Sequence, residues 1–173
     1  MTVPYRIAVV CLGNICRSPM AGAVLADRVA RAGLGDRVEV HTAGTGDWHV
    51  GHPMDRRAAA VLAAAGLDPS AHRAQQFDPG WFERFDLVPA MDAANRADLA
   101  ALCSTLGAEA GAALERVRMF RDFDPLADDA DRDVPDPYYG GDEGFDTVMA
   151  MVQRTADRLV AWLEGQLLGS EAR

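Results

Sequence analysis

The sequence has no lysine, few cysteines and no long hydrophobic run, and each absence excludes a class of protein. All 17 basic residues are arginine, and a net charge of −9 disfavours nucleic acid and anionic membranes as partners. Three cysteines do not make a disulfide framework, which predicts reduced thiols. No apolar run approaches the roughly 20 residues that cross a bilayer. The apolar run at 7–10 is too short for a signal peptide, so we expect a cytoplasmic protein.

The composition is that of one ordinary globular domain. The chain has 173 residues, of which 49% are hydrophobic and 25% are charged, and this length is sufficient to bury a core. The sequence contains no internal repeat and no low-complexity linker, so a single domain over residues 1–173 is expected. Nothing in the sequence requires more than a monomer. The all-arginine basic set and the many alanines suggest a GC-rich bacterial genome.

Strand-like and helix-like segments alternate along the chain. Apolar runs predict strands over residues 6–10, 38–42, 86–91 and 117–120. Helical spacing predicts helices over residues 20–32, 55–65 and 95–103, and a long final helix whose apolar face runs from Phe145 to Leu167. This alternation predicts an α/β fold with a parallel sheet covered on both faces. Pro89 removes a ladder donor from the third strand, so we expect a bulge or an early strand end there.

The segment between the first strand and the first helix predicts an anion site. It reads Cys-Leu-Gly-Asn-Ile-Cys-Arg-Ser-Pro and begins at Cys11, where ligands bind in open α/β sheets. Gly13 and Asn14 tolerate positive φ, so the loop can turn its N–H groups inward. Ser18 as N-cap and Pro19 as first helical residue predict a helix N-terminus that faces the same cavity.

The residue types in this loop favour phosphoryl chemistry. A thiol with a free pKa near ~8.5 is a useful nucleophile only when its thiolate is stabilised, and a nest, a helix N-terminus and an arginine all do this. Arg17 can fork onto two phosphate oxygens. Attack by Cys11 on phosphorus would form a phosphocysteine intermediate, and the Ser18 hydroxyl would stabilise the returning thiolate. The alternative, a buried core cysteine in a simple turn, leaves the accompanying residues unexplained.

Metal sites are disfavoured by the spacing of the candidate ligands. Cys11 and Cys16 lack a second ligand pair of the kind that zinc requires. Residues 129–133 superficially suggest a calcium loop, but Val134 replaces the required glycine and Gly140 the bidentate glutamate. We therefore expect neither a metal nor another cofactor.

A phenolate leaving group needs a proton, so a carboxylic acid is expected across the cavity. Asp124 and Asp136 both precede prolines, which stiffen the backbone and can aim a carboxylate. Only Asp136 is followed by an aromatic pair, Tyr138 and Tyr139, which can flank an aromatic substrate ring. This favours Asp136, although loop packing is the alternative role for the two tyrosines.

These motifs resemble those of the low-molecular-weight protein tyrosine phosphatases. The similarity begins with residues 11–21 and ends with Asp-Pro-Tyr-Tyr-Gly at 136–140. Between them it includes residues 42–45, Trp48, Gly51, Pro53, 72–74 and 86–92. The resemblance implies a compact doubly wound fold with a four-stranded parallel sheet flanked by helices on both faces. It also implies phosphotyrosine-containing proteins as substrates, and no metal.

The resemblance also assigns roles. Cys11 is the nucleophile, Arg17 the phosphate clamp and Asp136 the acid that later acts as base. Thr42 and His72 support the loop, and Thr42 stands where the family usually has serine but keeps a hydroxyl. The substrate-binding set comprises Leu12, Gly13, Asn14, Ile15, Cys16, Ser18, Trp48, Tyr138 and Tyr139. For Trp48 a half-buried anchor is the alternative.

Three other functions are less well supported. Arsenate reduction needs resolving cysteines in a loop after the second helix, and residues 66–92 contain none. Cys103 lies on an apolar helix, which favours a place in the core. Related phosphoarginine phosphatases carry threonine at the position of Ile15, whose apolar surface suits a phenyl ring. A silent phosphate-binding module needs neither the thiol nor the acid.

Two regulatory interpretations remain open. Cys16 either traps oxidised Cys11 as a reversible disulfide or merely packs under the loop. A tyrosine kinase acting on Tyr138 or Tyr139 is a further candidate partner.

Overall fold

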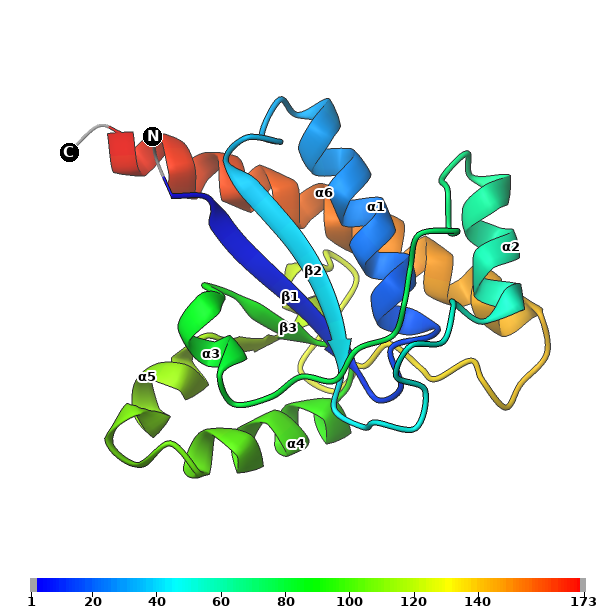
Figure 1. The fold of residues 1–173 in the computed structure, drawn as a ribbon. Helices are drawn as coiled ribbons and strands as arrows, with labels where there is room; N and C mark the ends of the chain where they lie inside the picture. The colour runs from blue at the N-terminus through cyan, green and yellow to red at the C-terminus, as the bar shows by residue number, and fades with distance from the viewer. Residues whose placement is uncertain (1–2, 172–173) are drawn as a thin grey trace.

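A four-stranded parallel sheet forms the centre of the molecule (Figure 1). The computed structural model describes residues 3–171. The strands are β1 (Tyr5–Cys11), β2 (Val38–Gly44), β3 (Val88–Ala90) and β4 (Val117–Met119), in the order β2-β1-β3-β4. All three pairings are parallel. The predicted α/β fold with a parallel sheet is confirmed.

Helices cover both faces of the sheet, as Figure 1 shows. One face carries α1 (Arg17–Arg31), α2 (Arg56–Ala64) and α6 (Glu143–Glu171). The other face carries α3 (Trp81–Arg84), α4 (Ala93–Ser104) and α5 (Ala110–Glu115). Two 3-10 turns, η1 (Gly107–Glu109) and η2 (Phe120–Phe123), flank α5 and β4. Within residues 3–171, no helix has the length and apolar character of a membrane span.

The alternating side chains of β1 explain why the sheet has a core on each face. Ile7 and Val9 pack into the core under α1 and α6, whereas Ala8 and Val10 pack into the core under α4. All four side chains are fully buried. A strand buried on both sides needs a continuous apolar run, which is what this segment supplies.

Pro89 limits the pairing of β3, as the sequence predicts. The expected strand over 86–91 is reduced to three residues, and its ladder with β1 consists of the single pair Val10↔Ala90. The Leu87 carbonyl accepts from the Ala8 N–H, and the Met91 N–H donates to the Val10 carbonyl. Pro89 lies between these two bonds on the same strand edge, where it has no N–H to donate. The other edge of β3 pairs normally with β4.

The helix limits follow capping residues. Asp55 caps α2 by accepting from the Arg57 N–H, and Asp92 caps α4 by accepting from the Asn95 N–H. Gly33 and Gly66 follow the ends of α1 and α2 with φ of 73° and 81°, a conformation that glycine adopts without strain. The short helices α3 and α5 were not predicted, because four or six residues are too few to show a helical period.

Candidate active site

The predicted anion-binding loop lies between β1 and α1. The helix begins at Arg17 with Cys16 as its N-cap residue, so the predictions of Ser18 as N-cap and Pro19 as first helical residue are wrong. The hydroxyl of Ser18 instead lies 3.0 Å from the sulfur of Cys11. The local preference of serine for a cap is overridden because a tertiary partner competes for the same hydroxyl.

Within residues 3–171, Asn14 is the one non-glycine residue with positive φ, at 56°. The expected positive φ at Gly13 is not observed. The role of Gly13 is steric instead, since a Cβ there would lie 3.0 Å from Cδ2 of His49. Gly13 thus allows the loop that contains Trp48 and His49 to approach the Cys11 loop closely.

The Cys11 side chain lies at the carboxyl end of β1, almost fully buried, and is surrounded by hydrogen-bond donors. Its sulfur accepts from the Asn14 N–H at 3.3 Å. The Ser18 oxygen accepts from the side-chain amide of Asn14 at 2.8 Å, which leaves its own proton free to point at the sulfur. A thiolate at this position would therefore receive two hydrogen bonds, and hydrogen bonds to a charged form favour that form.

Asn14 holds the loop in shape from beneath. It is fully buried, and its amide donates to Thr42 Oγ1 at 2.9 Å in addition to Ser18. Its Oδ1 accepts from the Gln75 N–H at 3.0 Å. Its backbone carbonyl lies 2.7 Å from Nε2 of His72, which donates this bond since a carbonyl only accepts. Burial lowers the pKa of His72, although the bond to Asn14 opposes this effect.

Thr42 fits its site because Gly22 of α1 has no side chain. A Cβ at Gly22 would lie 2.3 Å from Cγ2 of Thr42, a distance that van der Waals contact forbids. The additional methyl group of threonine, relative to serine, therefore occupies space that a helix glycine provides. The hydroxyl of Thr42 still accepts from the side-chain amide of Asn14.

Arg17 is 2% exposed and its guanidinium is fixed on two sides. Nη1 donates to Oδ2 of Asp92 at 2.5 Å and to the Val134 carbonyl at 3.0 Å. Nη2 lies 3.6 Å from Oδ2 of Asp136. Burial opposes the charged form, but Cys11, Asp92 and Asp136 outweigh it and raise the pKa of Arg17. Asp92 was missed as a site residue, although its position after β3 and before α4 is a usable signal.

A cleft of about 410 Å³ lies above the loop. It brings together the predicted residues Cys11, Leu12, Gly13, Ile15, Cys16, Arg17, Trp48, Asp136, Tyr138 and Tyr139. His49 also lines the cleft and was not predicted. Asn14 and Ser18, predicted to bind substrate, lie buried beneath it. Trp48 and Tyr139 are exposed by 66% and 92%, so the rim of the cleft is aromatic and open to solvent.

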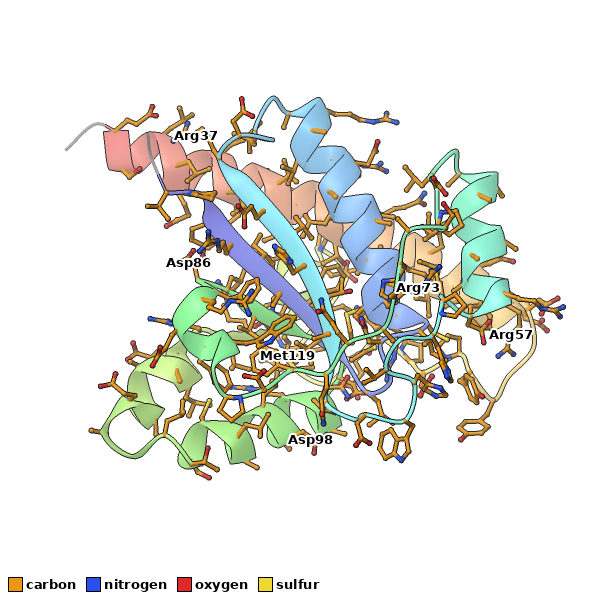
Figure 2. All side chains as sticks on the ribbon, viewed as in Figure 1. Arg37, Arg57, Arg73, Asp86, Asp98 and Met119 are labelled. Carbon is orange, nitrogen blue, oxygen red and sulfur yellow. The ribbon has the colours of Figure 1, made fainter. Side chains whose placement is uncertain are left out.

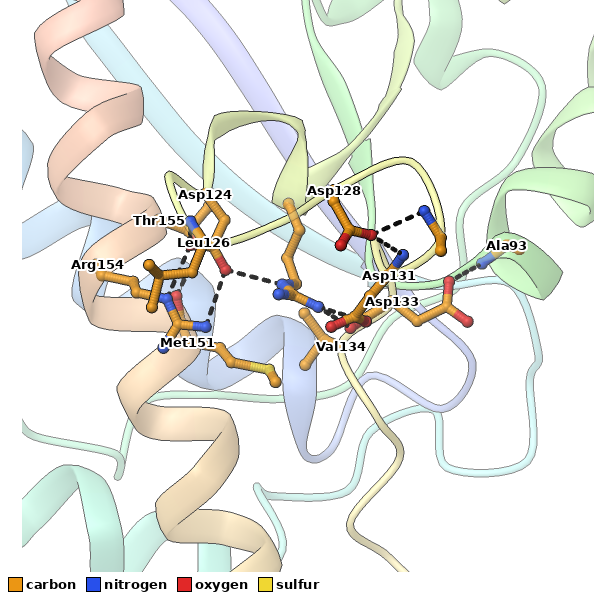
Figure 3. Close-up of polar contacts among 12 residues, drawn as sticks. Ala93, Asp124, Leu126, Asp128, Asp131, Asp133, Val134, Met151, Arg154 and Thr155 are labelled. Atoms are coloured by element: carbon orange, nitrogen blue, oxygen red, sulfur yellow. Dashed lines mark hydrogen bonds and ion pairs between the residues drawn. The ribbon is translucent and has the colours of Figure 1, made fainter.

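The second acid candidate, Asp124, is engaged elsewhere. Its carboxylate accepts from Arg121 at 2.8 Å and from Arg154 at 2.8 and 3.0 Å (Figure 3). Burial would raise the pKa of Asp124, but hydrogen bonds from Arg154, the Leu126 N–H and Arg121 lower it. Arg121 also donates to the Asp133 carbonyl at 2.8 Å, so this cluster supports the chain that leads to Asp136.

The other two cysteines differ from Cys11 in their surroundings. Burial, and then the charges of Asp55, Cys11 and Asp136, raise the pKa of Cys16 to about 12. Its thiol is therefore protonated at neutral pH. Cys103 is buried among the side chains under α4, which confirms its predicted place in the core. Within residues 3–171 the three cysteines are free, and no cluster of three or more metal-ligating side chains is present.

The chain is similar to known phosphatases over nearly its whole length. Residues 6–168 match the family described as low molecular weight phosphotyrosine protein phosphatase. A low molecular weight protein-tyrosine-phosphatase of Streptomyces coelicolor is 48% identical over 170 residues, covering 97% of this chain and 99% of that protein.

Solved structures agree with the sequence relatives. A protein tyrosine phosphatase from Entamoeba histolytica has a TM-score of 0.85 at 30% identity, covering 94% of this chain and 98% of that one. An arginine phosphatase from Drosophila has a TM-score of 0.81 at 26% identity, covering 91% and 96%. The match over nearly the whole length, together with the loop geometry at Cys11, shows that this chain belongs to the low molecular weight phosphotyrosine protein phosphatase family.

Proposed function

We propose that the protein hydrolyses phosphotyrosine in proteins without a metal ion, through a phosphocysteine intermediate. One observation carries the proposal. The Cys11 sulfur receives donors from Asn14 and Ser18 at the base of a cleft that Arg17 and Asp136 also line. A nucleophile, a phosphate-binding cation and a carboxyl group thus converge on one small volume.

In the first step, the Cys11 thiolate attacks phosphorus and the bond from phosphorus to the tyrosyl oxygen breaks. Asp136 gives its proton to that oxygen, so the product leaves as neutral tyrosine. Arg17 binds two of the phosphoryl oxygens with its guanidinium fork. Its bonds to Asp92 and Val134 hold the fork in place before substrate arrives, which reduces the entropy cost of the step.

In the second step, Asp136 is a carboxylate and removes a proton from water. The water oxygen attacks phosphorus, the bond from sulfur to phosphorus breaks, and inorganic phosphate is released. Cys11 leaves as a thiolate, which the hydrogen bonds of Ser18 and Asn14 stabilise. Asp136 regains its proton in this step and is ready for another first step.

The cleft favours an aromatic phosphate ester. Ile15 offers apolar surface at the rim, and Trp48 and Tyr138 can flank a phenyl ring. The fold itself does not separate phosphotyrosine from phosphoarginine, because the Drosophila arginine phosphatase shares it. Phosphoarginine is therefore the second candidate, and Ile15 is the residue that argues against it.

The two tyrosines after Asp136 differ in their access to a kinase. Tyr139 is exposed and so is accessible to a tyrosine kinase, whereas the ring of Tyr138 packs against Tyr139 and Arg57. Modification by a kinase, a monomeric state and a cytoplasmic location all stay predictions.

The test is phosphate release from a phosphotyrosine peptide and a phosphoarginine peptide, with EDTA present. We expect the native chain to prefer phosphotyrosine, and Cys11→Ser to lose turnover entirely. Cys103→Ala removes a thiol from the opposite core and is the matched control, with activity close to native. Faster turnover of phosphoarginine would overturn the substrate assignment alone. No turnover of either peptide by the freshly reduced native chain would overturn the proposed function.

A further inference from the structure

Arg57, near the start of α2, connects to the segment that carries Asp136. Its Nη2 donates to the Tyr138 carbonyl at 3.0 Å, and its Nη1 to the Gly140 carbonyl at 3.5 Å. Its Cζ lies 5.6 Å from the centre of the Tyr138 ring and 4.6 Å from that of the buried Phe145 ring, both within the range of cation–π attraction. Figure 2 shows Arg57 on α2, near the segment that leads into α6.

The contact with Tyr138 reaches the Asp136 carboxyl group through one residue. The Tyr138 N–H donates to Oδ1 of Asp136 at 3.1 Å, and the Tyr138 carbonyl accepts from Arg57. Tyr138 is therefore held at its carbonyl while its N–H orients the carboxylate. The other carboxylate oxygen of Asp136, Oδ2, lies 3.6 Å from Nη2 of Arg17.

The other end of the connection is the Cys11 loop. The Asp55 N–H donates to the Ile15 carbonyl at 2.8 Å. The Asp55 carboxylate accepts from Arg57 Nε at 3.2 Å and from Nη2 at 3.1 Å, and it caps α2 as well. Asp55 and Arg57 thus join the two segments on which the nucleophile and the acid stand. These segments are more than 100 residues apart in the sequence.

We infer that Arg57 is a positioning residue that sets the placement of the Asp136 carboxyl group relative to the leaving group. Arg57 contacts the acid's segment rather than the reacting atoms, so it acts through Tyr138 and Asp136. The inference rests on the proposed function. Its consequence is specific: loss of Arg57 should impair proton donation to the leaving group and leave phosphate binding by Arg17 unchanged.

Substrates that differ in their need for a proton test this role. Phenyl phosphate has a poor leaving group and depends on the acid, whereas 2,4-dinitrophenyl phosphate leaves as a stable anion and does not. We expect Arg57→Met to lower kcat/KM for phenyl phosphate by about 10-fold or more, since small misplacements of a catalytic group cost this much. For 2,4-dinitrophenyl phosphate we expect a change below about threefold, with inhibition by inorganic phosphate equally little affected.

Two further variants distinguish a positioning role of Arg57 from an effect of its charge and from a general loss of folding. Arg57→Lys keeps the charge but lacks the planar fork of the guanidinium. The ratio of its kcat/KM values for the two substrates should therefore lie between the ratios of the native chain and Arg57→Met. The exposed neighbour Arg56 is the matched control, and Arg56→Met should keep the native ratio. Equal losses on both substrates, or the same ratio shift in Arg56→Met, would overturn the inference while leaving the function intact. A native chain inactive on both substrates would overturn the function, and this role with it.

Discussion

The hydroxyl oxygen of Ser18 lies 3.0 Å from the sulfur of Cys11 while it accepts a hydrogen bond from the Asn14 amide. The accepted bond occupies one lone pair and leaves the hydroxyl proton for the sulfur. The Ala43 carbonyl, at 3.5 Å, is a more distant competitor for this proton. Ser18 is therefore placed to stabilise a departing thiolate.

Ser18→Ala should slow turnover at the second step. A hydrogen bond to a charged group contributes about 1.5–3 kcal/mol, which corresponds to roughly a 10- to 150-fold loss in kcat. Because the first step is less affected, phosphoenzyme should accumulate, and rapid-quench experiments would detect it as a larger burst. Ser104→Ala, on the outer face of α4, is the control. A kcat within about twofold of native would argue that the hydroxyl serves only to hold Asn14.

Asp136→Asn should remove the proposed general acid while the chain still folds. Position 136 is half exposed and the asparagine can still accept from the Tyr138 N–H. We expect kcat/KM on phosphotyrosine to fall by about 100-fold or more, the usual contribution of general acid catalysis. Asp129→Asn removes a fully exposed carboxylate from the same acidic segment and should be neutral. Near-native activity of Asp136→Asn would show that the proton comes from another group.

Asn14 combines a left-handed backbone with side-chain hydrogen bonds, and two variants separate these contributions. Asn14→Ala and Asn14→Gly both lose the bonds to Ser18, Thr42 and Gln75, but only alanine is strained at a φ of 56°. We expect Asn14→Ala to be less stable than Asn14→Gly by about 1 kcal/mol in urea unfolding. Both should lose most activity. Equal stabilities would mean that the loop relaxes out of the left-handed region in the variants.

The sequence predicts the parts of this molecule that depend on local pattern. The apolar segments along the chain predict the parallel sheet, and the residue types at 11–19 predict the loop at its carboxyl edge. Pro89 is also informative, because its missing N–H has the same consequence in any strand. These signals are contained within a few consecutive residues, so neighbouring elements are not needed to interpret them.

The remaining features depend on contacts between distant segments. The bond from Arg17 to Asp92 joins residues 75 positions apart, and the bond from Arg57 to Tyr138 joins residues 81 apart. No spacing rule identifies Asp92 among 26 acidic residues, or the backbone carbonyl of Tyr138 as the acceptor for Arg57. Ser18 is a different case, because its preference for an N-cap position gives way to hydrogen bonds with Cys11 and Asn14, seven and four residues earlier.

His72 predicts a pH dependence of stability. Burial lowers its pKa in the folded chain, so the unfolded chain, with an ordinary pKa of about 6.5, binds the proton more readily. The free energy of unfolding should therefore be highest above about pH 6.5 and fall as the pH drops below it. His72→Gln keeps a donor for the Asn14 carbonyl but does not titrate. Between pH 7 and 5 its free energy of unfolding should therefore change less steeply with pH than that of the native chain. As a control, replacing the exposed His52 by glutamine should leave the pH dependence of the free energy of unfolding as in the native chain. If His72→Gln also kept the native pH dependence, the effect would belong to other groups.

Cys16 predicts how oxidation of the enzyme depends on pH. Peroxide converts the Cys11 thiolate to a sulfenic acid, and a Cys16 thiolate can then attack that sulfur to form a disulfide and release hydroxide. Because the pKa of Cys16 is raised to about 12, little thiolate is present at neutral pH. The rate of disulfide formation should therefore rise about tenfold for each pH unit between 7 and 9.

The measurement is mass spectrometry of a Cys103→Ala chain, oxidised at pH 7 and then transferred to higher pH. If Cys16 protects the nucleophile, a disulfide between residues 11 and 16 appears, and activity returns with added thiol. The same chain carrying Cys16→Ser should instead advance to sulfinic acid and stay inactive. Full recovery of that variant would mean that Cys16 merely packs under the loop, where its burial beside Asp55 already accounts for a neutral thiol.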